Sequence, residues 1–314
     1  MRNRRKKILI ALGCIALVVA AITFFSRNTE PTTEPTYQGH SLSDWVRYAI
    51  GNQNPRAQAD ASDAISQIGT DALPYLLKWM RYEDKRPPFQ DNDLKSFFRR
   101  LPKRFIPRPL SGWAWGDYDE DTRAHGSALV IAQLGGGAKA AIPQLVEMLN
   151  NTNHARVSDR AAIALALMGE QGLQPLLDAL AKTNTPELTR RTVANRIGIS
   201  RNLERHASLA VPVLVKCLEA SDPKIQYGAA DALGRIVAEP LVVIPALTNC
   251  LNESTREDVR YAATWALGRY GEQARAAVPL LLTQLTNRDA AVRNWTTNTL
   301  HQIAPEVLTN SPAK

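Results

Sequence analysis

Residues 257–285 read EDVRYAATWALGRYGEQARAAVPLLLTQL and show the pattern of two consecutive amphipathic helices. In the first half, apolar residues follow the three- and four-residue spacing of one helix face: Val259, Ala262, Ala263, Ala266, Leu267 and Tyr270. Gly271 interrupts this pattern, and a second apolar face follows at Ala274, Ala277, Val278, Leu281, Leu282 and Leu285. Pro279 lies early in the second half, where a missing backbone N–H costs least. The stretch therefore predicts two short helices joined by a glycine turn.

The same unit recurs along the chain. A proline stands at the same point of most units, and the number of residues from one such proline to the next is nearly constant, as between Pro245 and Pro279. In the remaining unit, Gln174 beside Pro175 takes the place of this proline. The prolines of the other five units are Pro74, Pro143, Pro212, Pro245 and Pro279. Because one helix pair cannot bury its apolar face alone, the units must stack into an elongated array. The sequence predicts an all-α fold, an α-solenoid of about six helix pairs plus a terminal helix over residues 54–309, with the second helices lining its concave surface.

Short motifs repeat at equivalent positions of these units. Ala-Leu-Gly occurs at residues 232–234 and 266–268, Val-Arg at 259–260 and 292–293, and Ala-Val-Pro at 210–212 and 277–279. These residues resemble the HEAT-repeat family, particularly its short bacterial repeats of the phycobilisome-lyase type. The resemblance implies a curved stack of helix pairs that binds proteins on its surface, usually without catalysis. Residues 37–45, YQGHSLSDW, are similar to a lead-in found before such repeats in some membrane-attached bacterial proteins.

The N-terminal residues predict a membrane anchor. Residues 1–7 form a tail with five basic residues, and residues 8–25 form an unbroken apolar stretch. As a transmembrane helix this stretch spans roughly 27 Å, close to the ~30 Å hydrocarbon core of a bilayer. The basic tail places the N-terminus in the cytoplasm, so we expect a single-pass protein of the inner (cytoplasmic) membrane with a periplasmic body. A cleaved signal peptide, which would leave a secreted soluble binding protein, and a lipoprotein attached through Cys14 are the alternatives.

The remaining segments outside the repeats are short. Residues 26–53 form a spacer rich in proline and threonine followed by the lead-in, and residues 310–314 form a C-terminal tail. From His40 onward the chain has 32 basic and 28 acidic residues, so the body is only mildly basic. This charge balance gives no reason to expect a nucleic-acid partner.

An insertion separates the first and second units. The interval from Pro74 to Pro143 is twice the ordinary one, and removal of residues 85–121 restores a single step. We interpret the insertion either as a docking element for an anionic partner or membrane surface, or as a flap whose aromatic residues pack on its neighbours. Its interleaved basic and aromatic residues supply candidate partner-binding positions: Arg99, Arg100, Lys103, Arg104, Phe105, Trp113 and Trp115.

The fourth unit is locally cationic. Alignment on Gly198 puts Arg196 where other units have the small residues Ala232 and Ala266. One interpretation is a site for an anion or an acidic peptide; the other is that Arg196 extends to solvent from the rim of the packed face and pairs with a neighbouring acid. The candidate partner-binding residues of this unit are Arg190, Arg191, Arg196, Arg201 and Arg205.

The sequence lacks the motifs of common active sites. Its five histidines are scattered, and Cys-x-x-Cys, Gly-x-Ser-x-Gly and phosphate-loop patterns do not occur. Cys217 and Cys250 lie at equivalent positions of consecutive units, about 8–10 Å apart, which is too far for a disulfide. We therefore expect a membrane-tethered, non-catalytic scaffold for a protein partner, with no cofactor and no metal. A chromophore-lyase-like or other enzyme on the same fold is the alternative that the resemblance implies.

Overall fold

The computed structural model describes residues 34–51, 54–83, 117–182, 184–201, 203–252 and 255–309. The predicted tail, anchor and C-terminal residues, and the seven candidate residues of the insertion, lie outside these ranges. In the described part, no single helix is long and apolar enough to cross a membrane. One bent pair, Glu120–Gln133 with Gly135–Leu149, meets the same criteria of length and composition.

The body is an all-α solenoid of about 13 helices, as predicted. Each pair consists of a first and a second helix: α3 (Pro55–Ile68) and α4 (Leu73–Met80), α7 (Asp117–Gln133) and α8 (Ile142–Leu149), α9 (Ala155–Leu167) and α10 (Glu170–Ala181), α11 (Glu187–Ile197) and α12 (Ala207–Leu218), α13 (Pro223–Ile236) and α14 (Pro240–Asn249), α15 (Glu257–Tyr270) and α16 (Val278–Gln284). The terminal helix α17 (Ala290–Ile303) follows, with the short α18 (Glu306–Thr309) after it.

Local sequence signals explain where these helices begin. The side chains of Asn54, Asp222 and Asp289 cap α3, α13 and α17 by accepting a backbone N–H two residues on. The prediction that the repeat proline lies at the start of the second helix is confirmed for α4, α8 and α16. It is wrong for α10, α12 and α14, which begin one turn earlier and hold the proline inside the helix. The first three follow a 3₁₀ segment, as α12 also does, whereas α10 and α14 follow only a short turn.

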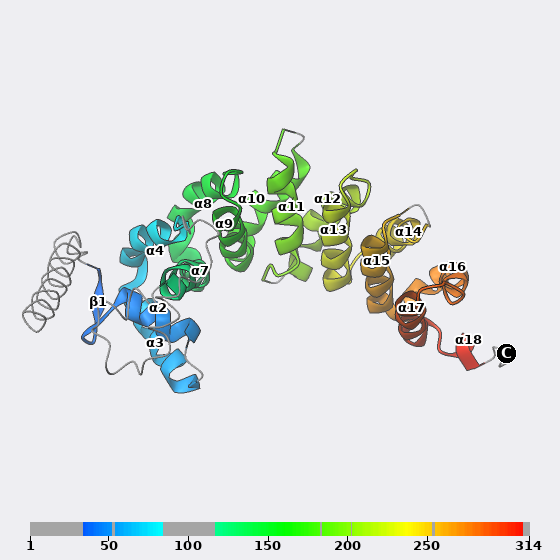
Figure 1. Ribbon diagram of the computed structural model, residues 1–314, viewed down its shortest axis with the longest axis horizontal. Coiled ribbons are helices and arrows are strands. Elements are labelled where there is room, and N and C mark those ends of the chain that lie inside the picture. Colours follow the sequence, from blue (N-terminus) through cyan, green and yellow to red (C-terminus); the bar gives the residue numbers. More distant parts are fainter. Residues whose placement is uncertain are drawn as a thin grey trace, which may run out of the picture.

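The first helices, not the second, line the concave side of the solenoid. Figure 1 shows the helix pairs following an arch, with α15 and α17 on its inner side and α14 and α16 on its outer side. Successive first helices contact one another more closely than successive second helices do. Small residues permit this approach: an added Cβ on Gly228 of α13 would lie 2.4 Å from the carbonyl group of Ala194 in α11. Close packing on one side shortens that side, so the array bends toward the first helices. The predicted concave lining was therefore wrong.

A hairpin and a helix cap the N-terminal end, within the predicted lead-in. The strands β1 (Thr36–Tyr37) and β2 (His40–Ser41) pair through a turn in which Gln38 and Gly39 have φ angles of 50° and 80°. Positive φ at both turn residues is the type I′ geometry that suits two-residue hairpins. Helix α2 (Leu42–Gly51) then packs against both α3 and α7, and the Gln133 side chain of α7 joins α7 directly to Ser62 of α3.

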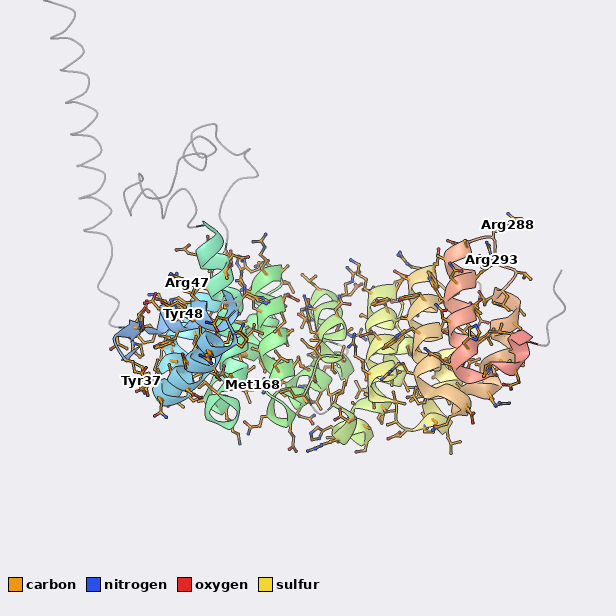
Figure 2. All side chains as sticks on the ribbon, turned by 90° about the horizontal axis from the view of Figure 1, so that it is seen from below. Tyr37, Arg47, Tyr48, Met168, Arg288 and Arg293 are labelled. Carbon is orange, nitrogen blue, oxygen red and sulfur yellow. The ribbon has the colours of Figure 1, made fainter. Side chains whose placement is uncertain are left out.

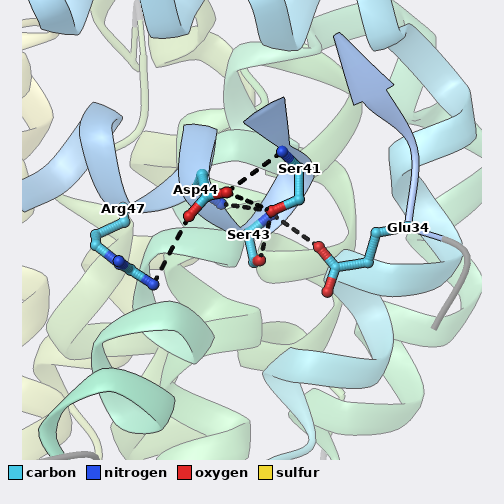
Figure 3. Close-up of polar contacts among 5 residues, drawn as sticks. All are labelled: Glu34, Ser41, Ser43, Asp44 and Arg47. Carbon is cyan, nitrogen blue, oxygen red and sulfur yellow. Dashed lines mark hydrogen bonds and ion pairs between the residues drawn. The ribbon is translucent and has the colours of Figure 1, made fainter. Parts of the chain in front are cut away.

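Polar contacts fix the start of α2 against the hairpin (Figure 3). The backbone N–H of Asp44 donates to the Ser41 hydroxyl at 3.3 Å, and the Ser41 N–H donates to the Asp44 carboxylate at 3.3 Å. This reciprocal pair is a capping box. The Ser43 N–H also donates to Glu34 at 3.0 Å, and Arg47 lies 3.9 Å from Asp44. The lead-in is therefore an ordered cap on the array.

The buried side chain of Arg160 joins the two ends of the insertion. From α9 it donates to the carbonyl oxygens of Met80 at 3.1 Å and Tyr82 at 2.7 Å, and it also pairs with Asp121. Residues 117–121, which the sequence places in the insertion, belong to α7, because an acidic run is favoured at a helix N-terminus. The chain thus leaves and re-enters the solenoid at points held together by one guanidinium.

A strained turn joins α13 to α14. Val237 and Glu239 have φ angles of 47° and 50°, in the left-handed region that a β-branched residue rarely adopts. The hydroxyl of Tyr270 donates to the carbonyl oxygen of Ala238, between these two residues, at 2.8 Å. Tyr270 is only 4% exposed, so this bond is shielded from water. A side chain of the next unit therefore holds the turn in place.

Two buried groups make the stability of the fold sensitive to alkaline pH. Burial raises the pKa of the Tyr270 hydroxyl from 10.0 to about 12 and the pKa of the Cys250 thiol from 9.0 to about 11. The folded state keeps these protons at a pH where the unfolded chain releases them, so their contribution to stability is complete below pH 9 and is lost as the pH rises toward 12. We expect thermal melts followed by circular dichroism to show this fall in Tm. The double variant Tyr270→Phe/Cys250→Ala should show a shallower fall, and an unchanged slope would contradict this assignment.

Candidate functional site: a cationic groove between α10 and α12

Grooves open on the outer side of the arch, where successive second helices stand apart. The groove between α10 and α12 has a volume of about 360 Å³. The end of α10, one residue of α11 and the exposed side of α12 form its walls, and three of its lining side chains are basic: Lys182, Arg190 and Lys216. Glu219 is the single acidic residue in the lining. The groove is therefore cationic.

Arg190 is the residue that makes this groove unusual. Its Nε atom is buried and has no hydrogen-bond partner, and no ion pair joins its guanidinium to a carboxylate among the described residues. The guanidinium lies against the Cys217 thiol; burial raises the pKa of that thiol, and Arg190 and Lys216 partly oppose the effect. A half-buried guanidinium without a carboxylate partner among the described residues favours a carboxylate that is brought by a ligand.

The other two basic side chains reach the groove from its rims. Lys182 directly follows α10 and lies 3.3 Å from Asp178, so its charge is partly compensated. Lys216 is exposed on α12, one turn after the repeat proline. Together with Arg190 of α11, these two lysines present donors to one volume, which suits a carboxylate or another anion rather than a cation.

Two of the five arginines predicted for this region have carboxylate partners of their own. Arg196 donates to both oxygens of Asp159, at 2.6 and 2.9 Å, with its side chain 39% exposed. Arg191 pairs with Glu187 at 2.7 Å and with Asp222. The interpretation of Arg196 as a rim residue that pairs with a neighbouring acid is confirmed. These two side chains stabilise contacts between units and leave Arg190 as the predicted arginine that lines the groove.

Arg201 and Arg205 lie elsewhere in the fourth unit. Arg201 follows α11 and Arg205 lies in the 3₁₀ segment η4 (Leu203–His206); both are exposed, and neither lines the groove. The sequence predicts the local cationic character but not which side chains share a volume. Lys182 and Lys216 could be recognised as exposed from the repeat, because the buried positions Leu180, Leu214 and Leu218 alternate with them.

A second groove lies on the other side of α12. It lies between α12 and α14, has a volume of about 200 Å³, and shares Glu219 with the cationic groove. Its other polar lining residues are uncharged: Gln226, Asn249 and Thr255. The two grooves flank α12 and share Glu219 as a lining residue; the first is cationic, and Glu219 is the one charged residue that lines the second.

The chemistry of the groove favours binding. Its cysteine, Cys217, is 3% exposed and has a raised pKa, so the reactive thiolate is disfavoured at neutral pH. Cys217 and Cys250 are both free and buried, which confirms their prediction as small apolar residues of the stack. Over the described ranges, no cluster of three histidine, cysteine or carboxylate side chains could hold a metal ion.

Comparisons with known proteins identify the repeats. Residues 186–268 and 244–310 match a family model described as HEAT repeats. A sequence comparison with curated proteins gives no match. Among solved structures, the chain is similar to Kap121p bound to Pho4p (14% identity, TM-score 0.42, covering 87% of this chain and 36% of that one). It is also similar to human deoxyhypusine hydroxylase (14% identity, TM-score 0.34, 83% and 95%).

A third similar structure is the complex of CpcE and CpcF of phycocyanin lyase from Nostoc sp. PCC7120, with 15% identity, a TM-score of 0.36, and coverage of 91% of this chain and 94% of that one. The chain spans little more than a third of the length of Kap121p. The repeat pattern, the stacked helix pairs and the family match all describe one architecture. Residues 186–310 of this all-α solenoid are HEAT repeats.

Proposed function

We propose that the protein is a non-catalytic scaffold that binds a protein partner, and that an acidic segment of this partner docks in the cationic groove between α10 and α12. HEAT-repeat solenoids commonly bind proteins, which supports the general role. The observation that carries the specific proposal is Arg190, whose guanidinium faces the groove without a carboxylate among the described residues. Lys216 and Lys182 add positive charge to the same volume, so a carboxylate side chain from the partner would complete the site.

We further propose that residues 8–25 tether the body to the inner membrane, with the solenoid on the periplasmic side. The apolar stretch and the basic residues before it support this arrangement. Fractionation of cells that produce the full chain tests it, together with protease digestion of intact spheroplasts. The solenoid should stay with the membrane fraction and be digested from outside. Recovery of the body in the soluble fraction would contradict the tether.

Binding of an acidic peptide tests the groove. We expect a fluorescent peptide of alternating aspartate and serine to bind the full chain in detergent, and the variant Arg190→Gln/Lys216→Gln to bind it at least about 10-fold more weakly, because charge-assisted hydrogen bonds contribute about 1.5–3 kcal/mol each. Fluorescence anisotropy measures both affinities. The matched control is Arg201→Gln/Arg205→Gln, which removes the same charge from the same unit outside the groove.

The control separates a specific groove from general attraction. Its affinity should stay within about 3-fold of that of the unaltered protein, because exposed charges outside the site act only through a screened field. If both double variants weaken binding equally, the groove is not the site. If neither does, the acidic-segment proposal is wrong.

A further inference from the structure

A second cleft lies at the N-terminal cap and differs from the groove in chemistry. It has a volume of about 570 Å³ and is bounded by the hairpin, α2 and α3. Four aromatic or imidazole side chains and two carboxylates are among its lining residues: Tyr37, His40, Trp45, Tyr48, Asp60 and Asp63. Tyr37 and Tyr48 lie at the same end of the array in Figure 2, far from Arg288 and Arg293 at the other end.

The rings of the cleft are held in a defined arrangement. His40, Trp45 and Tyr48 contact one another edge to face, with ring centroids 5.1, 5.8 and 5.7 Å apart. The indole N–H of Trp45 donates to the Tyr37 carbonyl at 3.2 Å, which ties α2 to the hairpin. Trp45 is 6% exposed and anchors the cluster, whereas Tyr48 is half-buried and His40 is exposed. The cleft thus presents fixed aromatic surface to solvent.

Two carboxylates of α3 line the same cleft. Asp60 and Asp63 are one helical turn apart, both are exposed, and neither has an ion pair or hydrogen bond among the described residues. Most other aspartates of the described ranges have such a partner, as Asp159 and Asp222 do. Aromatic faces attract cations through their quadrupole, and carboxylates attract them through charge. Both features of the cleft therefore favour the same kind of ligand.

We propose that this cleft binds a lysine or arginine side chain of a partner polypeptide, with the cation between the aromatic cluster and the carboxylates of Asp60 and Asp63. Charge complementarity excludes an anion, and the polar lining disfavours a purely apolar ligand. The cleft is open along the surface, so it admits a side chain that projects from a chain lying across it. The site is independent of the cationic groove, because it lies at the N-terminal end of the array and uses none of the groove residues.

A pair of peptides that differ only in charge tests the proposal. The probes are a labelled peptide of glycine with three arginines and its citrulline counterpart, each titrated against the full chain in detergent by fluorescence anisotropy. We expect the arginine peptide to bind at least about 10-fold more tightly than the citrulline peptide. Equal binding of the two would overturn the proposal, as would a citrulline peptide that binds more tightly.

Variants of the cleft locate the binding. Asp60→Asn/Asp63→Asn should weaken binding of the arginine peptide at least about 10-fold, whereas the matched control Asp71→Asn/Glu170→Gln, which removes two exposed acids outside the cleft, should leave it within about 3-fold. Tyr48→Leu should weaken binding several-fold and Tyr48→Phe should preserve it, because the ring face and not the hydroxyl is used. Circular dichroism checks that each variant is folded. Equal weakening by the control pair, or loss in Tyr48→Phe equal to that in Tyr48→Leu, would overturn the assignment.

Discussion

Replacement of Arg160 by methionine is expected to lower the free energy of unfolding by about 3 kcal/mol. Arg160 is 4% exposed, and its guanidinium satisfies the carbonyl oxygens of Met80 and Tyr82 together with the Asp121 carboxylate. Methionine fills much of the same space but offers no donor, so the carbonyl oxygens of Met80 and Tyr82 and the Asp121 carboxylate lose this guanidinium at once. The loss affects α4, α7 and α9 together, because the side chain connects all three.

Thermal and urea unfolding of the Arg160→Met variant measures this cost. A loss of about 3 kcal/mol corresponds to a fall in Tm of roughly 6–12 °C for an array of this size. The matched control is Arg156→Met on the same helix, whose side chain is 64% exposed and lies 3.7 Å from the same carboxylate of Asp121. An exposed pair contributes at most about 1 kcal/mol. Similar losses in the two variants would show that Arg160 does not hold the ends of the insertion together.

Substitution of Gly228 by alanine is expected to destabilise the protein by about 2 kcal/mol, and substitution by leucine by more. In an exposed helix the change from glycine to alanine stabilises by up to about 1 kcal/mol. Here the new Cβ would lie 2.4 Å from both the carbonyl carbon and the carbonyl oxygen of Ala194, and a backbone cannot yield as a flexible side chain can. The helices α11 and α13 must therefore move apart on the concave side.

Two measurements detect the separation of α11 and α13. Urea unfolding gives the stability, and small-angle X-ray scattering gives the maximum dimension, which should increase as the arch opens. The control is Gly198→Ala, where the added Cβ would meet only the side chains of Arg235 and Asp231, at 3.1 Å, and the backbone has an ordinary helical φ of −63°. Its stability should change by less than about 1 kcal/mol. A Gly228→Ala variant as stable as this control would contradict the explanation of the curvature.

Much of the fold can be predicted from the sequence because the same pattern of apolar residues, glycine and proline occurs in several units. The spacing of Pro212, Pro245 and Pro279 and the apolar faces around them predict the helix pairs, and the structure contains them. The direction of curvature was predicted wrongly. The direction depends on whether the first or the second helices of neighbouring units approach more closely. Contacts such as that of Gly228 with Ala194 join two units, so the sequence pattern within one unit does not reveal these contacts.

The candidate site was predicted only as a cationic region. Sequence proximity grouped Arg190, Arg191 and Arg196, yet consecutive helix positions point in different directions, and two of these side chains meet acids of neighbouring units. The partners, Asp222 and Asp159, are 31 and 37 residues away. The N-terminal cleft was missed for a similar reason: Tyr37, Trp45 and Asp63 come from three elements that only the packing of α2 brings together.

Site-specific photo-crosslinking in the native cell tests the central claim, that a protein partner occupies the cationic groove, most directly. A benzoylphenylalanine at Val213, which lines the groove, should yield a discrete crosslinked species containing a second protein. The same group at Ser208, exposed on the same helix but outside the groove, should yield none. The species from Val213 should also disappear when Arg190→Gln/Lys216→Gln is added. Equal crosslinking from both positions, or a species that survives the loss of both basic residues, would contradict the account.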